Sequence, residues 1–258
     1  MQRTTRHCIA AVFSVLSLLL VSCPDLAGND ATFELYFVNA SKHTTVQVET
    51  LELVNQQTGQ LENVLDETVG QRRVVKLLLS AEKFATGFAT VRFTGQQTPL
   101  GAPIPFTEEA SGFRVGPGPT GIALVNVGQR GKFEPIVSAF EITDARDAKG
   151  ANTFNYYLLN ITGLSVSEVE LKNLQTDDFE PLLLVPMPPF TLLIQPVSTA
   201  IHSGQDSETN IIMETGQSVS VGFAQFGPEP EGGVVFDSDE SGDITPEADF
   251  FIVDNSVE

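Results

Sequence analysis

Short alternations of hydrophobic and polar residues run through most of the chain. In residues 33–37, Phe and Leu alternate with Glu34 and Tyr36, a period of two that is typical of a β-strand with one buried face. Further strand-like segments lie at 46–50, 74–79, 89–93, 121–127, 154–162, 182–185, 190–195 and 218–223. Gly- and Pro-rich turns separate many of them, and only residues 80–84 have room for a helical turn. The pattern predicts an all-β protein.

Two blocks of sequence recur in the same order. Residues 154–162 (FNYYLLNIT) match residues 33–41 (FELYFVNAS), and residues 169–176 (VELKNLQT) match residues 51–58 (LELVNQQT). Strand periodicity alone would not align the Asn, Gln and Thr residues, so the match indicates duplication, with chance similarity of strand patterns as the alternative.

Several short strands with intervening turns favour two tandem immunoglobulin-like antiparallel β-sandwich domains. We expect the first domain at residues 32–142, a linker at 143–152 and the second domain at 153–236. An acidic C-terminal segment at residues 237–258 follows.

The first 23 residues have the pattern of an export signal. Two arginines precede an apolar run at residues 9–20, which is too short to span a bilayer, because spanning needs about 20 apolar residues. The run ends in Leu20-Val21-Ser22-Cys23, which resembles the lipobox of bacterial lipoproteins. The resemblance implies a signal peptide at 1–22, diacylglyceryl attachment to Cys23 and a tether at 23–31. An ordinary signal peptide and an uncleaved anchor are the alternatives.

The same resemblance implies a lipid-anchored protein of the bacterial cell envelope, with the outer membrane favoured over the inner membrane. The chain has two cysteines; Cys8 would leave with the signal peptide and Cys23 would be acylated. The mature chain would then have no free thiol and no disulfide, which excludes cysteine nucleophiles and Cys-ligated zinc.

Charge is distributed very unevenly along the chain. The formal net charge is −19, and after Lys172 there is no Lys or Arg but 16 of the 33 carboxylates. An acidic surface repels phosphate backbones, so we expect no nucleic-acid binding. The expected partners are a membrane, through the lipid on Cys23, and an unknown envelope protein or polysaccharide.

One acidic segment is a candidate metal site. Residues 237–245 (DSDESGDIT) fit the first nine positions of an EF-hand calcium loop, with Gly242 at the sharp turn. The candidate ligands are Asp237, Asp239, Ser241 and Asp243. The twelfth position is Ala248 instead of a bidentate Glu, and the flanking segments are strand-like instead of helical. Ca²⁺ is thus the one candidate cofactor, and a solvated acidic turn is the alternative.

Each copy also resembles a bacterial domain of unknown function that occurs in tandem in envelope proteins. The resemblance rests on residues 35–41 (LYFVNAS) and 121–128 (GIALVNVG) in the first copy, and on residues 156–162 (YYLLNIT) and 216–222 (GQSVSVG) in the second. The family's usual Asp-Ala-Pro after the first strand is absent, and residues 42–45 (KHTT) stand in its place. The resemblance implies no activity, since the family has none assigned.

The sequence contains no recognisable catalytic constellation. The two histidines outside the signal segment, His43 and His202, have neither metal-ligand spacing nor a Ser-His-Asp context, and no pair of carboxylates stands out. We therefore expect a membrane-anchored envelope lipoprotein with a non-catalytic structural or binding role, and no enzyme. A calcium-binding surface module and a carboxylate-dependent hydrolase are the alternatives.

Overall fold

A computed structural model describes residues 31–41, 44–98, 101–128, 132–145, 150, 152–183, 186–237 and 245–254. The chain divides into two units, Met1–Ala31 and Thr32–Glu258, and the second unit contains all the described elements. Most of the described residues are in β-strands, which confirms the all-β prediction. The predicted signal peptide and Cys23 lie outside the described residues.

The same succession of elements occurs twice along the chain. The first half contains β1 (Thr32–Ser41), β2 (Thr45–Val54), β3 (Leu61–Asn63), β4 (Arg73–Ser80), α2 (Ala81–Phe84), β5 (Thr86–Thr98), β6 (Ile104–Val115), β7 (Thr120–Asn126) and β8 (Pro135–Ala145). The second half contains β9 (Thr153–Asn160), β10 (Val166–Lys172), β11 (Phe179–Pro181), β12 (Thr191–Ser198), α3 (Thr199–His202), β13 (Gly204–Met213), β14 (Ser218–Phe226), β15 (Glu231–Asp237) and β16 (Pro246–Asp254). The helical turn expected at residues 80–84 is α2.

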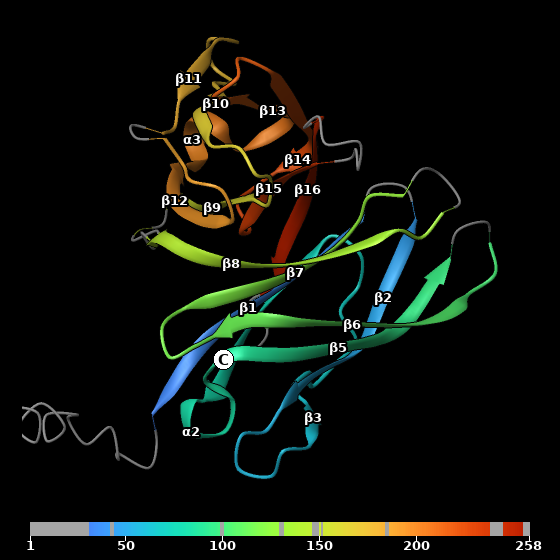
Figure 1. Ribbon diagram of the computed structural model, residues 1–258. Helices are drawn as coiled ribbons and strands as arrows, with labels where there is room; N and C mark the ends of the chain where they lie inside the picture. The colour runs from blue at the N-terminus through green and yellow to red at the C-terminus, as the bar shows by residue number, and fades with distance from the viewer. Residues whose placement is uncertain are drawn as a thin grey trace, which may run out of the picture. The chain divides into compact units, whose positions relative to one another are not determined.

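The described strands form one closed barrel and two flanking sheets (Figure 1). The barrel has the order β1-β4-β16-β15-β9-β12-β8-β7, so each half of the chain supplies four of its strands. One flanking sheet, β3-β2-β5-β6, comes from the first half, and the other, β11-β10-β13-β14, comes from the second. Closure leaves the barrel without the unpaired edges that an open sheet presents.

The two halves are joined by reciprocal strand pairing. In the first half β1 pairs antiparallel with β4 and parallel with β7, and in the second half β9 pairs in the same ways with β12 and β15. Parallel pairs of β8 with β12 and of β16 with β4 then close the barrel. Residues 246–254, placed in the acidic C-terminal segment by the sequence analysis, form β16. The finer prediction of two separate immunoglobulin-like domains is not confirmed, since both halves share one barrel.

Three hydrophobic cores correspond to this layered arrangement. On β1, Phe33, Leu35 and Phe37 belong to a first core with residues of the first flanking sheet. Tyr36, Val38 and Ala40 alternate with them and belong to a second core, which combines barrel residues of both halves. A third core joins the second half's barrel strands to its own flanking sheet. Barrel strands are therefore buried on both faces, which accounts for the almost continuous apolar run in β7.

A glycine beneath an aromatic ring occurs at matching barrel positions in the two halves. Gly121 on β7 lies opposite Phe140 on β8, and Gly232 on β15 lies opposite Phe251 on β16. A Cβ at Gly121 would lie 1.9 Å from a ring atom of Phe140, and one at Gly232 would lie 2.7 Å from the ring of Phe251. Each ring can cover the neighbouring strand because glycine has no side chain.

One predicted strand is wrong where the structure describes it. Leu182 and Leu183 lie outside the strands, although residues 182–185 were expected to form one, and residues 184–185 lie outside the described part. The Leu182 N–H still donates to the Val169 carbonyl, and an isolated bridge joins Met187 to Val166. Prolines at positions 186, 188 and 189 have no N–H to donate, so regular pairing does not continue.

Candidate functional site

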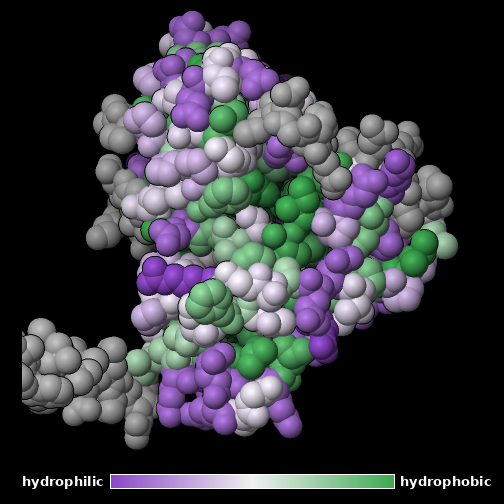
Figure 2. All heavy atoms as spheres, in the orientation of Figure 1, coloured by the Kyte–Doolittle hydropathy of each residue, from purple (hydrophilic) through white to green (hydrophobic). Residues whose placement is uncertain are grey.

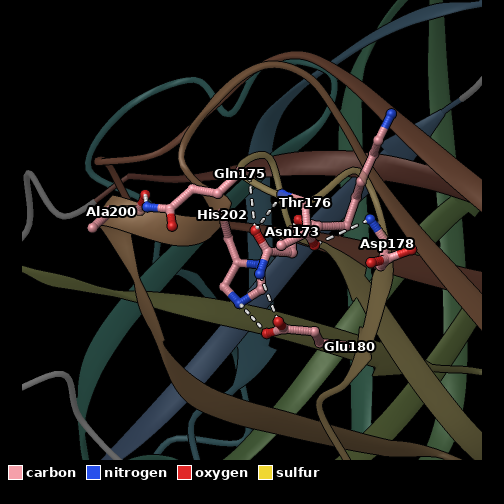
Figure 3. A network of polar contacts seen from close by, with 8 residues as sticks. Asn173, Gln175, Thr176, Asp178, Glu180, Ala200 and His202 are labelled. Atoms are coloured by element: carbon pink, nitrogen blue, oxygen red, sulfur yellow. Dashed lines mark hydrogen bonds and ion pairs between the residues drawn. The ribbon is translucent and has the colours of Figure 1, made fainter.

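A network of polar contacts surrounds the turn between β10 and β11 (Figure 3). The Asn173 side chain is buried, and its Nδ2 donates to Glu180 Oε1 at 2.6 Å. Its Oδ1 accepts the backbone N–H groups of Gln175 at 2.8 Å and of Thr176 at 3.3 Å. These bonds fix the path of the turn, as Asn side chains do when they bond to the backbone two residues on.

His202, the last residue of α3, joins this network from the core side. Its Nδ1 lies 3.0 Å from the carbonyl oxygen of Lys172, and its Nε2 lies 4.0 Å from Glu180 Oε2. The matching residue at the end of α2 is Phe84, which is also buried. His202 therefore occupies a core position of the fold and uses its polar edge to hold β10 and β11 together, consistent with the absence of a catalytic motif around it.

The turn between β2 and β3 in the first half has the same Asn–Glu hydrogen bond and Asn-to-backbone bond, without a histidine. Asn55 donates through Nδ2 to Glu62 Oε1 at 2.6 Å, and its Oδ1 accepts the N–H of Gln57 at 2.8 Å. Asn39, near the end of β1, and Asn160, at the end of β9, are alike in role: Nδ2 of Asn39 donates to the Val69 carbonyl and Nδ2 of Asn160 to the Pro188 carbonyl. The repeated Asn residues thus serve the fold by satisfying buried backbone groups.

An arginine side chain forms an ion pair at the junction where β16 pairs with β4. Arg72, just before β4, places Nε 2.9 Å from Asp249 Oδ2, and its guanidinium carbon lies 4.5 Å from the ring centroid of Phe250. Asp249 is only 6% exposed. A buried carboxylate needs such a charged partner, and the aromatic face adds a cation–π contact.

The matching junction of β8 with β12 is open instead. Phe190 stands just before β12 and is 45% exposed, while Ala139 takes the place that Phe250 has at the other junction. A cavity of about 420 Å³ results, and Arg114 and Glu141 supply its charged groups, with their side chains 3.9 Å apart. Its remaining lining is mainly proline, threonine and phenylalanine. The side chains of Arg114 and Glu141 are 65% and 71% exposed, so this cavity is open to solvent.

Of the four predicted calcium ligands, the structure describes only Asp237. It is the last residue of β15, and its Oδ1 accepts the N–H of Thr245 at 3.0 Å. Asp239, Ser241 and Asp243 lie outside the described residues. The flanking elements are the antiparallel strands β15 and β16, as the sequence indicated. Within the described ranges, no group of three or more His, Cys, Asp or Glu residues could hold a metal ion.

Two ionisable groups in the second half have shifted pKa values. Burial raises the pKa of the Glu231 carboxyl, an N–H from Gly227 opposes this rise, and Glu229 adds to it. The Lys172 ammonium has a raised pKa, chiefly because it bonds to the Asp177 carboxylate at 2.7 Å. At the position of Glu231 the first half has Thr120, whose hydroxyl accepts the N–H of Gly116 at 3.2 Å. The second half thus has an acidic residue, Glu231, at a partly buried position where the first half has the neutral Thr120.

Sequence reasoning missed the residues at the two junctions. Arg72 and Asp249 are 177 positions apart, and nothing local in the sequence links them. The sequence showed only that an arginine and a carboxylate each lie beside a strand-like segment. Among the described residues, no helix has the length and apolar character needed to cross a membrane.

Comparison with known proteins gave little similarity. No family model matches the chain, and no curated protein matches it. Among solved structures, an NMR structure of a protein from Eubacterium rectale aligns with 44% of this chain and 99% of its own length, at 14% identity and a TM-score of 0.30. A similarity this low supports no conclusion about fold or function.

Proposed function

We propose that the chain is a membrane-anchored lipoprotein of the bacterial cell envelope with a non-catalytic structural or binding role. The observation that carries the proposal is Leu20-Val21-Ser22-Cys23, followed nine residues later by the first strand at Thr32. Nine residues span at most about 30 Å, so a lipid on Cys23 would hold the folded body close to the membrane surface. The partner would be another envelope protein or a polysaccharide.

The fold supports this role through its interlocked halves. We infer that each half is an immunoglobulin-like sandwich, that the halves arose by duplication and that they share a barrel. Matched pairs such as Asn39 with Asn160 and Gly121 with Gly232 favour this origin. The Asn side chains bond to buried backbone groups, and the glycines, which have no side chain, leave room for core rings, which is the behaviour of a scaffold.

Replacing the acylated residue tests the proposal directly. Cys23→Ser should abolish incorporation of labelled palmitate and shift the protein from the membrane fraction to an unprocessed or released form. Cys8→Ser is the matched control, because that residue leaves with the signal peptide and should not affect either result. Processed, membrane-bound Cys23→Ser protein would contradict the proposal.

A calcium-binding role is the second candidate, and the bond between Asp237 Oδ1 and the Thr245 N–H favours it by drawing together the ends of the acidic loop. Calcium at ten times its dissociation constant would stabilise the fold by about 1.4 kcal/mol and raise Tm. Asp243→Asn should remove that rise. Asp237→Asn, which keeps the Oδ1 acceptor, separates loss of charge from loss of the loop bond. An unchanged Tm in millimolar calcium contradicts this role.

A further inference from the structure

Three connections of the first half lie at the end of the molecule where β1 begins (Figure 1). Thr32 pairs with Ser80, and α2 starts at the next residue. The N–H of Gln56, in the turn between β2 and β3, donates to the Lys83 carbonyl at 2.7 Å. Gly116, which opens the β6–β7 connection, packs against the Phe33 ring. We call these connections, residues 56–60, 81–88 and 116–119, the leading end.

The leading end is almost uncharged on a chain whose net charge is −19. Its three segments contain one acidic residue, Glu82, and one basic residue, Lys83, which sum to zero. The matching segments of the second half, residues 174–178, 199–206 and 227–230, contain Asp177, Asp178, Asp206 and Glu229 and no Lys or Arg, which sum to −4. Figure 2 shows hydrophilic residues around β11 at one end and also around α2 and β3 at the other, so the contrast between the two ends lies in their charge. The two equivalent ends therefore differ strongly in charge.

A large aromatic side chain projects into solvent from the leading end. Phe88 is 85% exposed and stands just before Ala89, the first core-facing residue of β5. Its counterpart, just before the core-facing Ser207 of β13, is Asp206. Leu78, 66% exposed, lies two residues from the same end on β4. Phe88 is the most exposed of the large hydrophobic residues in the described part of the chain.

We propose that the leading end rests on the bilayer that holds the lipid of Cys23, with Phe88 inserted at the interface. This inference depends on the proposed lipid anchor. The anchor lies nine residues before Thr32, at most about 30 Å from this end. Zero net charge avoids repulsion by anionic headgroups, and an apolar side chain such as Phe gains free energy when it is buried at the boundary between headgroups and acyl chains. The matching segments of the second half carry a charge of −4, and Asp206 takes the place of Phe88 there.

The chain contains no tryptophan, so Phe88→Trp creates a single fluorescent reporter at the leading end. A chain that starts at Cys23 retains every described residue and has one thiol, which couples to phosphatidylcholine vesicles bearing a maleimide lipid. After coupling, Trp emission at position 88 should move to shorter wavelength, and brominated lipids should quench it. Phe179→Trp, at a 40% exposed Phe of β11, is the matched control and should show neither change.

The outcomes separate this inference from the anchor itself, because chemical coupling does not depend on processing in the cell. Unchanged emission of Trp at position 88 after complete coupling overturns the inference, and so does a shift only in the Phe179→Trp variant. If the Trp emission at position 88 shifts in native envelope membranes but not on protein-free vesicles, a protein partner covers the leading end and the inference is overturned. Equal thermal unfolding of both variants and the parent chain shows that the reporters leave the fold intact.

Discussion

Phe88 and Asp206 stand at the same point of two equivalent hairpins, yet one is an exposed ring and the other a carboxylate. The hairpins begin alike, with Thr86 opposite Val115 in the first half and Gly204 opposite Phe226 in the second. The connections around Phe88 carry no net charge, whereas the matching connections around Asp206 carry four carboxylates, with Lys172 bonded to one of them, Asp177. The two halves have therefore kept one framework and acquired different surfaces.

Positions at which both halves have the same residue show which residues the shared fold requires. Asn at the end of the first barrel strand, Asn at the β2–β3 or β10–β11 turn, and Gly beneath an aromatic ring occur in both halves. Each satisfies buried backbone groups or allows close packing. Positions that differ, such as Arg72 against Phe190, lie where the halves meet each other or the solvent. Identities between the halves thus point to the fold, whereas differences occur both at surfaces and at buried positions such as Phe84 against His202.

The largest effect should come from filling the barrel glycines. Gly232→Ala should lower the free energy of unfolding by about 3 kcal/mol, because the new Cβ would lie 2.1 Å from the Tyr157 carbonyl oxygen, which is backbone. Gly121→Ala should cost less, about 2 kcal/mol, since the clash there is with the side chain of Phe140. Urea unfolding measures both.

Gly222→Ala on β14 serves as the control, because a Cβ there meets nothing within 4 Å. Its stability should stay within about 0.5 kcal/mol of the parent. Equal losses at Gly121 and Gly232 would show that the ring of Phe140 is as immovable as the backbone at the matching position, and would remove this difference between the halves.

The next effect concerns the two junctions. Arg72→Ala should lower the free energy of unfolding by about 2 kcal/mol, because it leaves the Asp249 carboxylate buried without its cation; partial exposure of Arg72 keeps the loss below that of a fully buried pair. Phe190→Ala should cost only about 1 kcal/mol, because its ring is nearly half exposed. Chemical unfolding of both variants makes the comparison.

A double-mutant cycle distinguishes the ion pair from simple loss of packing. In an Asp249→Asn background, Arg72→Ala should cost clearly less than in the parent chain, because no buried charge is then left unpaired. If the cost is the same in both backgrounds, the contact of Arg72 with Phe250 stabilises this junction and the ion pair does not.

Much of the secondary structure could be predicted from the sequence, but the closure of the barrel could not. Alternation at residues 33–37 and 89–93 located β1 and β5 because each has a distinct buried face. Parallel pairing of β8 with β12 joins segments about 50 residues apart and leaves no local pattern. The almost continuous apolar run in β7 was a sign of burial on both faces, which a separate sandwich with one solvent-facing side would not need.

The features of the candidate sites can also be separated into those that the sequence predicted and those that it did not. Strand-like flanks around the acidic loop were correctly expected, whereas Cys23, Asp239, Ser241 and Asp243 lie outside the described residues, so their roles stay predictions. The alternation at 89–93 places residue 88 on the outward face of β5 with Thr90 and Arg92, but it carries no information on whether another element covers the Phe88 ring. The cavity beside Phe190 results from a small residue, Ala139, where the other half has Phe250, and only the fold aligns those two positions.

The smallest effect should appear at Glu231, whose place in the first half is taken by the neutral Thr120. Burial raises the pKa of Glu231 above its ordinary value of 4.5, so the folded state binds a proton more readily than the unfolded state. This group's contribution to stability is therefore most favourable below pH 4.5 and falls as pH rises through the raised pKa. Glu231→Gln keeps an oxygen to accept the Gly227 N–H and removes the charge, so it should stabilise the chain at pH 7 by less than about 1 kcal/mol. At pH 4 the gain should vanish.

Urea midpoints at both pH values measure the difference, and Glu229→Gln is the exposed control. A gain of equal size at pH 4 would mean that the charge of Glu231 does not set the two halves apart.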